Sequence, residues 1–143
     1  MNVKTILAAK GGDVISIEPT ATLAAAAQLM SARRIGSLVI RGAGGRLAGI
    51  LSERDIVSAL GLRGASALAL PVGQVMTRNV ETCGEHDSVA SLMERMTEGK
   101  FRHLPVVERG DVVGIVSIGD VVKQRVEEIE SESEALRDYI RQG

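Results

Sequence analysis

Hydrophobic positions along the chain follow two patterns, and each pattern occurs twice. Positions 23, 26, 27 and 30 are apolar, as are positions 89, 92, 93 and 96, which is the i, i+3, i+4, i+7 spacing of a helix with one buried face. Two short runs rich in β-forming residues follow each helix and flank a turn, at 37–41 with 47–51 and at 103–107 with 112–116. Each half of the chain is therefore predicted to form a helix and a β-hairpin.

The two halves are copies of one unit. Val89 stands 66 positions after Leu23, whereas Gly114 stands 65 positions after Gly49. The one-residue change falls in the hairpin turn, where a change of length is tolerated, and not in the strands. An internal repeat of this kind predicts one structural unit built twice.

Two further elements complete each copy. A short strand is expected at 14–17 and at 80–83, and a second helix is expected from about Glu53 and from about Asp120. Because a unit of about 60 residues has too small a core to cover its sheet alone, we expect the copies to pack together about a pseudo-two-fold axis. The predicted fold is mixed α/β (α+β), with two β-α-β-β-α repeats and a long C-terminal helix. The expected bounds are 1–60 for repeat 1, 61–71 for a connector, 72–125 for repeat 2 and 126–143 for the helical extension.

The C-terminal segment has a heptad-like apolar stripe. Its members are spaced 4, 3, 4, 3 and 4 residues apart and are Val122, Val126, Ile129, Ser133, Leu136 and Ile140. The stripe is too short, with a serine in the seam, to predict a coiled coil from the sequence alone. Docking on another surface and packing against its own module both stay open.

Composition and charge exclude several classes of function. The chain has 17 Lys and Arg, 18 Asp and Glu, one Phe, one Tyr and no Trp, which argues against nucleic-acid binding through a basic patch or stacking aromatics. The single Cys83 excludes an internal disulfide, and with only His86 and His103 it cannot complete a tetrahedral zinc site. No apolar run approaches the roughly 20 residues of a membrane span. We expect a soluble, cytoplasmic protein.

Candidate chemistry lies in a segment that both copies share. Glycine, two apolar residues, serine, two further residues and aspartate end a strand and open a helix, at 49–55 and at 114–120. A short carboxylate at a helix start suits the two hydroxyls of a ribose, and serine with free backbone amides suits a phosphate. The alternative is plain helix capping, in which the serine and the aspartate form a capping box.

These segments give the chain its resemblance to a known family. Gly49-Ile50-Leu51-Ser52-Glu53-Arg54-Asp55, Gly114-Ile115-Val116-Ser117-Ile118-Gly119-Asp120 and Phe101-Arg102-His103-Leu104-Pro105-Val106-Val107 resemble CBS motifs, the modules named for cystathionine β-synthase. Residues 1–125 resemble a tandem pair, or Bateman module, of the stand-alone bacterial type. The resemblance implies two clefts between the repeats that bind adenosine-containing ligands: AMP, ADP, ATP, S-adenosylmethionine or NAD.

The resemblance also implies roles for particular residues. One cleft would use Ser52, Arg54 and Asp55, with the backbone of Val80 and Glu81 against adenine. The other would use Ser117, Gly119 and Asp120, with Val14 and Ile15 against adenine, and Arg102 and His103 would face phosphates. In each cleft the aspartate would hold the ribose. Only the first has a cation, Arg54, directly before that aspartate, because Gly119 offers no more than its amide.

A regulatory adenine-nucleotide sensor is therefore the predicted function, acting through a ligand-dependent change in the geometry of the module or of a homodimer. The stripe would be buried in that dimer, with Phe101 as one candidate receiver, and an unidentified regulated protein would sense the change. We expect no catalysis and no metal or catalytic cofactor, because a duplicated ribose and phosphate site favours binding over turnover. The alternative is a structural or adaptor module whose clefts stay empty.

Overall fold

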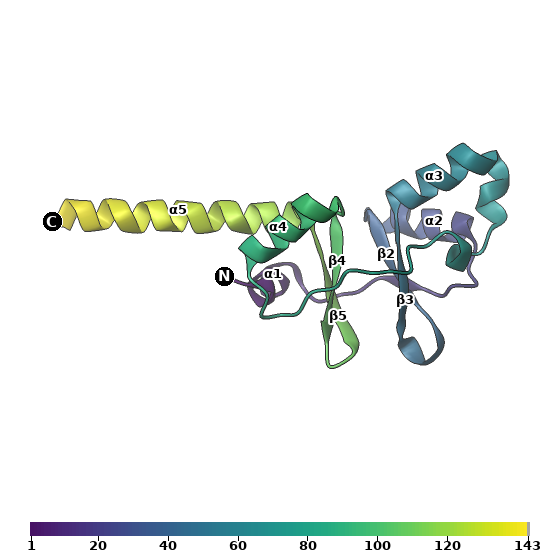
Figure 1. Ribbon diagram of the computed structural model, residues 1–143, viewed down its shortest axis with the longest axis horizontal. Coiled ribbons are helices and arrows are strands. Elements are labelled where there is room, and N and C mark those ends of the chain that lie inside the picture. The colour runs from purple at the N-terminus through teal and green to yellow at the C-terminus, as the bar shows by residue number, and fades with distance from the viewer. Residues whose placement is uncertain (143) are drawn as a thin grey trace. The chain divides into compact units, whose positions relative to one another are not determined.

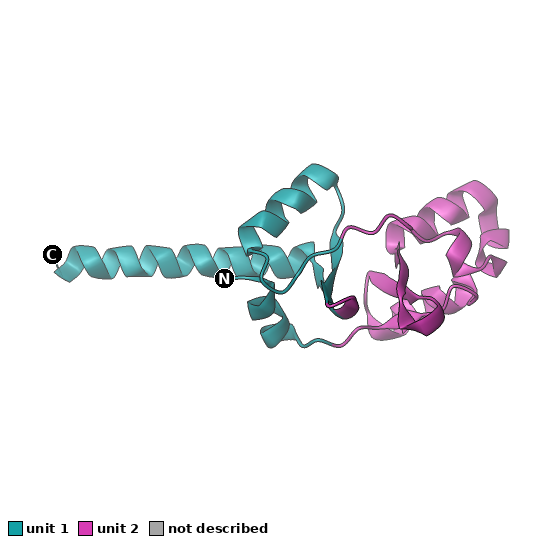
Figure 2. Cartoon of the chain, turned by 60° about the horizontal axis from the view of Figure 1, so that its bottom comes forward, with its two compact units in different colours: residues 1–12, 82–108, 113–143 teal, residues 13–81, 109–112 magenta. Residues whose placement is uncertain are grey.

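The computed structural model describes residues 1–142, and these residues form two compact units (Figure 2). Unit 1 contains residues 1–12, 82–108 and the described residues from 113 onward. Unit 2 contains residues 13–81 and 109–112. Each unit therefore combines segments that lie far apart in the sequence.

Unit 2 contains a three-stranded sheet and two helices (Figure 1). The middle strand is β2 (Ser37–Arg41), with β1 (Ser16–Ile17) parallel on one side and β3 (Leu47–Ser52) antiparallel on the other. The helices are α2 (Leu23–Arg33) and α3 (Glu53–Arg63). Four successive residues of β2 are buried, as expected of a strand covered on both faces.

The core of unit 2 consists of aliphatic residues and methionine, which fits a chain with one Phe, one Tyr and no Trp. It also includes short 3-10 turns that follow α3, η2 (Gly64–Ala69) and η3 (Val72–Gln74), whereas a third, η1 (Ala43–Gly45), forms the turn between β2 and β3. The buried residues of this core are Leu23, Ala26, Met30, Leu38, Ile40, Leu51, Ala59, Ala67 and Val72. The segment after α3 is thus part of the core and not only a connection.

Unit 1 contains a two-stranded hairpin and three helices (Figure 1). The hairpin is β4 (His103–Glu108) with β5 (Asp111–Ser117), of which the first two residues and the turn before them belong to unit 2, and the helices are α1 (Val3–Lys10), α4 (Val89–Gly99) and α5 (Ile118–Gln142). The buried core of the unit is Val3, Ile6, Cys83, Val89, Leu92, Met96, Leu104, Val106, Val116 and Val121. The second helix of repeat 2 and the C-terminal helix are one continuous α5.

Each unit contains the segment that opens the other repeat in the sequence. Helix α1 opens repeat 1 but buries Val3 and Ile6 in the core with the helices and hairpin of repeat 2, and Val72 opens repeat 2 but lies in the core with the helices and hairpin of repeat 1. These segments contact Gly49 and Gly114, the first residues of the two shared motifs. A Cβ on Gly49 would lie 2.8 Å from the Thr77 carbonyl oxygen, and one on Gly114 would lie 2.6 Å from Leu7 Cδ2. The glycines are therefore required by the close approach of those segments.

The mixed α/β class, the duplicated helix and hairpin, and the long C-terminal helix are confirmed. The strand expected at 80–83 is wrong, because only Cys83 makes an isolated parallel bridge, to Val106. Between residues 1 and 142 no helix is both long enough and apolar enough to span a bilayer.

Candidate functional site

In unit 2 the shared motif forms a reciprocal hydrogen-bonded cap at the start of α3. The backbone N–H of Ser52 donates to Asp55 Oδ2 at 2.9 Å and the Ser52 hydroxyl donates to the same oxygen at 3.1 Å, while the Asp55 N–H donates to Ser52 Oγ at 3.3 Å. The capping box expected as the alternative is therefore present. It engages one carboxylate oxygen and leaves the other for further contacts.

The second oxygen of Asp55 faces a segment that the sequence reasoning did not include. Thr77 Oγ1 lies 3.5 Å from Asp55 Oδ1. Thr77 is held there by a bridge to Ile50, with N–H to oxygen distances of 3.0 and 2.9 Å in the two directions. The chain then continues to Val80 and Glu81, so that the predicted adenine-binding backbone follows directly from a residue beside the carboxylate. We call Ser52, Arg54, Asp55 and 77–81 the Ser52 site.

Arg54 is exposed, in the first turn of α3, between two capping residues. The adjacent Glu53 N–H donates to the Gly36 carbonyl at 3.0 Å, which places Gly36 and the first residue of β2 next to the motif. Neither Gly36 nor Ser37 carries a charge, so Arg54 supplies the positive charge at this end of the Ser52 site.

In unit 1 the same cap forms at the start of α5. The Ser117 N–H donates to Asp120 Oδ2 at 2.9 Å, and the Asp120 N–H donates to Ser117 Oγ at 3.2 Å. Among residues 1–142, no hydrogen bond reaches Asp120 Oδ1. This carboxylate therefore also has one capping oxygen and one available oxygen.

Lys10, the last residue of α1, lies on Asp120. Its ammonium donates to Asp120 Oδ2 at 2.7 Å and to the Ile115 carbonyl at 3.0 Å. Burial by itself raises the pKa of Asp120, but the hydrogen bonds from Lys10 and Ser117 and the charge of Lys10 outweigh it, so the pKa lies below 3.8. Sequence reasoning missed Lys10, because it lies 110 positions from Asp120 and the helix that carries it packs with the other repeat.

Arg102 also lies beside the cap in unit 1. The Ile118 N–H donates to the Arg102 carbonyl at 2.8 Å, which is the counterpart of the contact between Glu53 and Gly36 in unit 2. Arg102 is exposed, and His103 is half-buried at the start of β4. We call Ser117, Gly119, Asp120, Lys10, Arg102 and His103 the Ser117 site. Its cations come from α1 and from the strand end, whereas the cations of the Ser52 site are Arg54 in the helix and Arg78 in the segment 77–81.

The remaining predicted residues lie in unit 2. Val14 and Ile15 are half-buried before β1, and the Ile15 carbonyl accepts from the Val39 N–H at 3.3 Å. Ile15 also packs against the core of that unit. The adenine contact of Val14 and Ile15 stays a prediction.

The two sites offer carboxylates, hydroxyls, backbone amides and cations, which suit ribose and phosphate groups. No group of three or more His, Cys, Asp or Glu side chains within residues 1–142 is arranged to hold a metal ion. Cys83 is a buried core residue, and burial raises the pKa of its thiol to about 12. That thiol is therefore protonated and unreactive at neutral pH.

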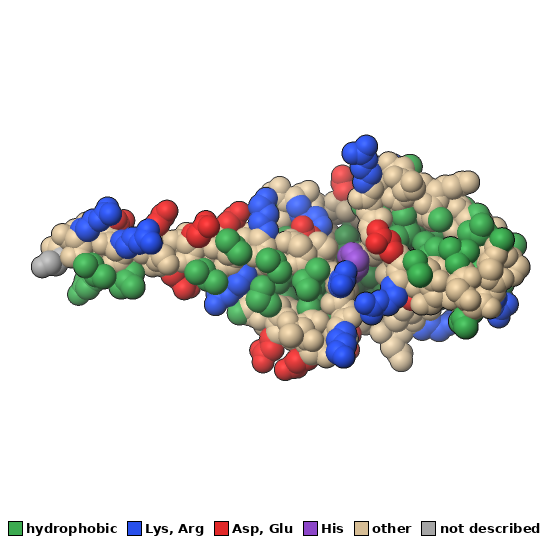
Figure 3. Space-filling view, turned by 90° about the horizontal axis from the view of Figure 1, so that it is seen from above, with side chains coloured by type: hydrophobic (Ala, Val, Ile, Leu, Met, Phe, Trp, Pro, Cys, Tyr) green, Lys and Arg blue, Asp and Glu red, His purple; other side chains and the backbone are tan. Residues whose placement is uncertain are grey.

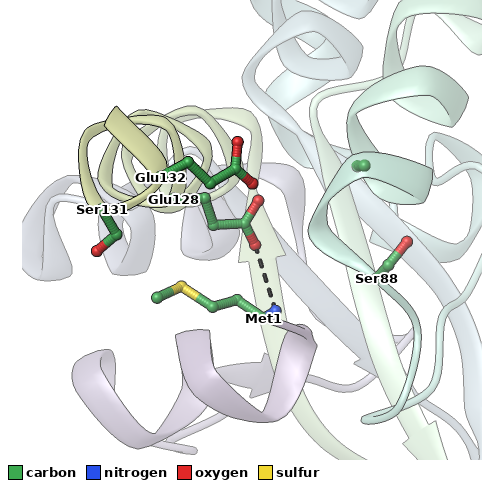
Figure 4. A pocket seen from close by; sticks show the side chains of 6 residues that line it. Met1, Ser88, Glu128, Ser131 and Glu132 are labelled. Carbon is green, nitrogen blue, oxygen red and sulfur yellow. Dashed lines mark ion pairs between the residues drawn. The ribbon is translucent and has the colours of Figure 1, made fainter. Parts of the chain in front are cut away.

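A surface pocket of about 390 Å³ lies elsewhere in unit 1 (Figure 4). It is lined by Met1, Ser88, Ala90, Glu128, Ser131 and Glu132, and the Met1 amino group pairs with Glu128 at 3.5 Å. None of these residues belongs to the Ser52 site or the Ser117 site, so the pocket is not evidence for ligand binding at either one.

The family follows from comparison with known sequences. A family model for the CBS domain matches residues 4–62 and again residues 72–127. The chain belongs to the CBS domain family. It is 35% identical over 122 residues to the mitochondrial CBS domain-containing protein CBSX3 of Arabidopsis thaliana, which covers 82% of this chain and 59% of that protein. The chain thus spans less than two thirds of this curated relative.

Solved structures of CBS proteins have the same fold. The CBS-domain containing protein ATU1752 of Agrobacterium tumefaciens superposes with a TM-score of 0.85 at 44% identity, covering 87% of this chain and 92% of that one. The CBS protein PAE2072 of Pyrobaculum aerophilum, complexed with AMP, has a TM-score of 0.75 at 28% identity, covering 84% and 89%. The CBS pair of MJ0100, complexed with 5-methylthioadenosine and S-adenosyl-L-methionine, has a TM-score of 0.79 at 28% identity, covering 90% and 98%.

Proposed function

We propose that this CBS pair is a regulatory module that binds an adenine nucleotide and transmits its occupancy as a change in the geometry of the module or of a homodimer. The observation that carries the proposal is the duplicated Ser–Asp junction, in which each carboxylate keeps one oxygen outside its cap. The adenosine compounds bound by two of the structural neighbours support the same ligand class.

In the Ser52 site, we assign the ribose to Asp55, whose Oδ1 makes only a 3.5 Å contact with Thr77 among residues 1–142. Two ribose hydroxyls can donate to that oxygen while Oδ2 continues to cap α3. Ser52 and the exposed guanidinium of Arg54 would bind the phosphate, and the backbone of Val80 and Glu81 would bind adenine. The helix dipole of α3 adds to the attraction for the phosphate.

In the Ser117 site, Asp120 has the ribose role, and Val14 and Ile15 keep the adenine role that the resemblance implies. The ammonium of Lys10 lies 2.7 Å from Asp120 Oδ2, which leaves Oδ1 outside the ion pair. The ribose hydroxyls would donate to Oδ1, and the ammonium of Lys10 would pair with the phosphate. Arg102 and His103 at the strand end, Ser117, and the amide of Gly119 complete the phosphate contacts.

The cations favour a phosphate-bearing ligand, AMP, ADP, ATP or NAD, over S-adenosylmethionine. Arg54 on one side and Lys10 with Arg102 on the other would pair with phosphate oxygens, whereas the positive sulfonium of S-adenosylmethionine gains nothing from them. The cations come from different elements in the two sites, so we expect the two affinities to differ.

A thermal-shift panel tests the proposal, with AMP, ADP, ATP, NAD, S-adenosylmethionine and adenosine as ligands and GMP as the control nucleotide. A ligand at 100 times its dissociation constant adds about 2.7 kcal/mol, which raises the melting temperature of a domain of this size by roughly 5–15 °C. If none of the adenine compounds shifts the melting temperature at millimolar concentration, nucleotide binding is refuted and the adaptor function replaces it.

A further inference from the structure

Helix α5 exposes the apolar stripe that the sequence predicts. Val126 and Ile129 are each 48% exposed, Leu136 is 60% exposed and Ile140 is 66% exposed. In Figure 3 hydrophobic side chains follow one edge of this helix and charged side chains follow the opposite edge. The stripe is therefore not covered by the chain's own residues.

Unit 1 uses another face of α5. The buried residues of the helix are Val121 and Gln124, and Glu128 pairs with Arg125 and with the Met1 amino group. At 100° per residue, the face with Val121, Gln124 and Glu128 points about 130° away from the centre of the stripe. The same helix can therefore stay docked on its own unit and present the stripe to a partner.

We propose that the partner is a second copy of this chain, and that two α5 helices pair through the stripe as a parallel, in-register, two-stranded coiled coil. The inference rests on the homodimer of the proposed function and specifies its interface. Phe101, one receiver considered from the sequence, is half-buried and packs against the core of its own unit. The charges beside the stripe and the serine within it support a second stripe as the receiver.

The charges beside the stripe select this arrangement. With Val126, Ser133 and Ile140 at the a positions of the heptad, Arg125 and Glu132 are g residues and Glu130 and Arg137 are e residues. In a parallel pair each g residue meets the e residue of the partner's next heptad. Arg125 then meets the partner's Glu130, and Glu132 meets the partner's Arg137. Both contacts join opposite charges, and symmetry forms each of them twice.

An antiparallel pair would bring like charges together. When the two stripes cover each other in that orientation, e residues meet e residues and g residues meet g residues. Glu130 then faces the partner's Glu130, Glu132 faces the partner's Glu132, and Lys123 lies near the partner's Arg137. All three contacts are repulsive, so the charge pattern opposes this orientation.

Ser133, the serine in the stripe, also favours the parallel orientation. In a parallel pair Ser133 lies opposite the partner's Ser133, and the two hydroxyls can bond to each other. In the antiparallel pair Ser133 lies opposite the partner's Ile129, which buries a hydroxyl against an apolar side chain.

The charges of the second predicted pair, Glu132 and Arg137, have no competing contact in the part of the chain that the structure describes. Glu132 and Arg137 form no hydrogen bond or ion pair with any of residues 1–142, whereas Arg125 already pairs with Glu128 at 2.9 Å. The contact between Glu132 and the partner's Arg137 is therefore the more diagnostic of the two.

Cysteine cross-linking of the full chain tests the orientation. Ser133→Cys should form an intermolecular disulfide under mild oxidation, because a residues at the same height in a parallel coil lie side by side. Ser131→Cys, the same change at an outward position two residues away, is the matched control and should cross-link at least tenfold more slowly. The native Cys83 stays in both variants because its buried, protonated thiol does not compete. Equal cross-linking of the two variants would overturn the proposal.

A charge exchange tests the pairing by sedimentation equilibrium. Glu132→Arg and Arg137→Glu should each raise the dimer dissociation constant about fivefold, since each removes two exposed ion pairs. The double variant should return it to within about twofold of the original, which an antiparallel pair would not do. No rescue refutes the parallel coil.

Two outcomes separate this inference from the proposed function. A dimer without the Ser133→Cys cross-link refutes the coil and leaves the homodimer standing. A full chain that is monomeric at tens of micromolar refutes both the coil and the homodimer. Neither outcome affects nucleotide binding, which the thermal-shift panel measures independently.

Discussion

Asp55 and Asp120 each cap a helix with one carboxylate oxygen, and the other oxygen takes no part in the cap. The capping contacts to Ser52 and Ser117 measure 2.9 Å from the backbone N–H in both sites. Helix capping and ribose binding, which are alternatives when only the sequence is considered, are therefore compatible in one side chain. A capping box holds the carboxylate in a fixed orientation, which reduces the entropy that a ligand contact must overcome.

Replacing each aspartate tests that dual role. Asp55→Ala and Asp120→Ala should each abolish one of two binding events and lower the free energy of unfolding by only about 1 kcal/mol, the usual contribution of a cap. Isothermal titration with the nucleotide that gives the largest thermal shift measures stoichiometry and affinity for each variant. Unchanged stoichiometry and affinity in both, with the stability loss present, would mean that the aspartates only cap.

Lys10 should determine whether the Ser117 site prefers a phosphate. Lys10→Met removes the cation and frees Asp120, so we expect the affinity for AMP in this site to fall about fivefold to tenfold while that for adenosine stays the same or rises. Titrations of both ligands into the Asp55→Ala background isolate the site. A parallel fall for AMP and adenosine would contradict the phosphate role of Lys10.

The lowered pKa of Asp120 predicts an acid-dependent loss of stability. A carboxyl whose pKa is lower in the folded state stabilises the fold above its unfolded pKa, about 3.9, and this contribution disappears as the pH falls through the folded value. Asp120→Asn should therefore lose less stability than the unaltered chain between pH 5 and pH 3 in urea titrations. Asp55→Asn keeps the pair of Lys10 and Asp120 and serves as the control. Identical pH profiles for Asp120→Asn and the unaltered chain would contradict this.

At the scale of elements, the two motif glycines mark where one segment presses on another. The obstacle at Gly49 includes the Thr77 carbonyl oxygen at 2.8 Å, which the bridge to Ile50 fixes in place. The obstacle at Gly114 is the end of the Leu7 side chain at 2.6 Å, which can rotate. The two copies therefore need glycine to different degrees.

Alanine at these glycines should reveal that difference. Gly49→Ala should cost about 2–3 kcal/mol and Gly114→Ala about 1 kcal/mol, as overpacking against backbone exceeds overpacking against a mobile side chain. Gly61→Ala, in α3 with no atom within 4 Å of the added Cβ, is the control and should be neutral or stabilising. Urea denaturation provides the comparison, and equal costs at Gly49 and Gly114 would contradict the explanation.

At the scale of the whole molecule, α5 connects the Ser117 site to the proposed dimer, because Asp120 lies in its first turn and the stripe begins at Val122. In the proposed dimer, a nucleotide bound at the start of α5 would thus change the position of the helix that pairs with its copy. Coupling of this kind is reciprocal, so any factor by which nucleotide strengthens the dimer equals the factor by which dimerisation strengthens nucleotide binding.

Truncation of the helix tests that connection. A chain ending at Gln124 should be monomeric at tens of micromolar, because it lacks the stripe beyond Val122, and should still bind nucleotide because both Ser–Asp junctions remain. Sedimentation velocity with and without nucleotide, beside the full chain, makes the measurement. A truncated chain that stays dimeric would place the dimer interface outside α5.

The sequence by itself determined the local elements, the duplication and the polar groups of the two sites. Helix spacing, hairpin turns and capping pairs such as Ser52 with Asp55 depend on residues within a few positions of one another, so their pattern is visible along the chain. Tertiary structure decided what depends on distant contacts. It paired Lys10 with Asp120, placed Thr77 beside Asp55 and reduced the strand expected at 80–83 to one bridge at Cys83. Those results follow because each unit contains the segment that opens the other repeat, an exchange that local periodicity does not reveal.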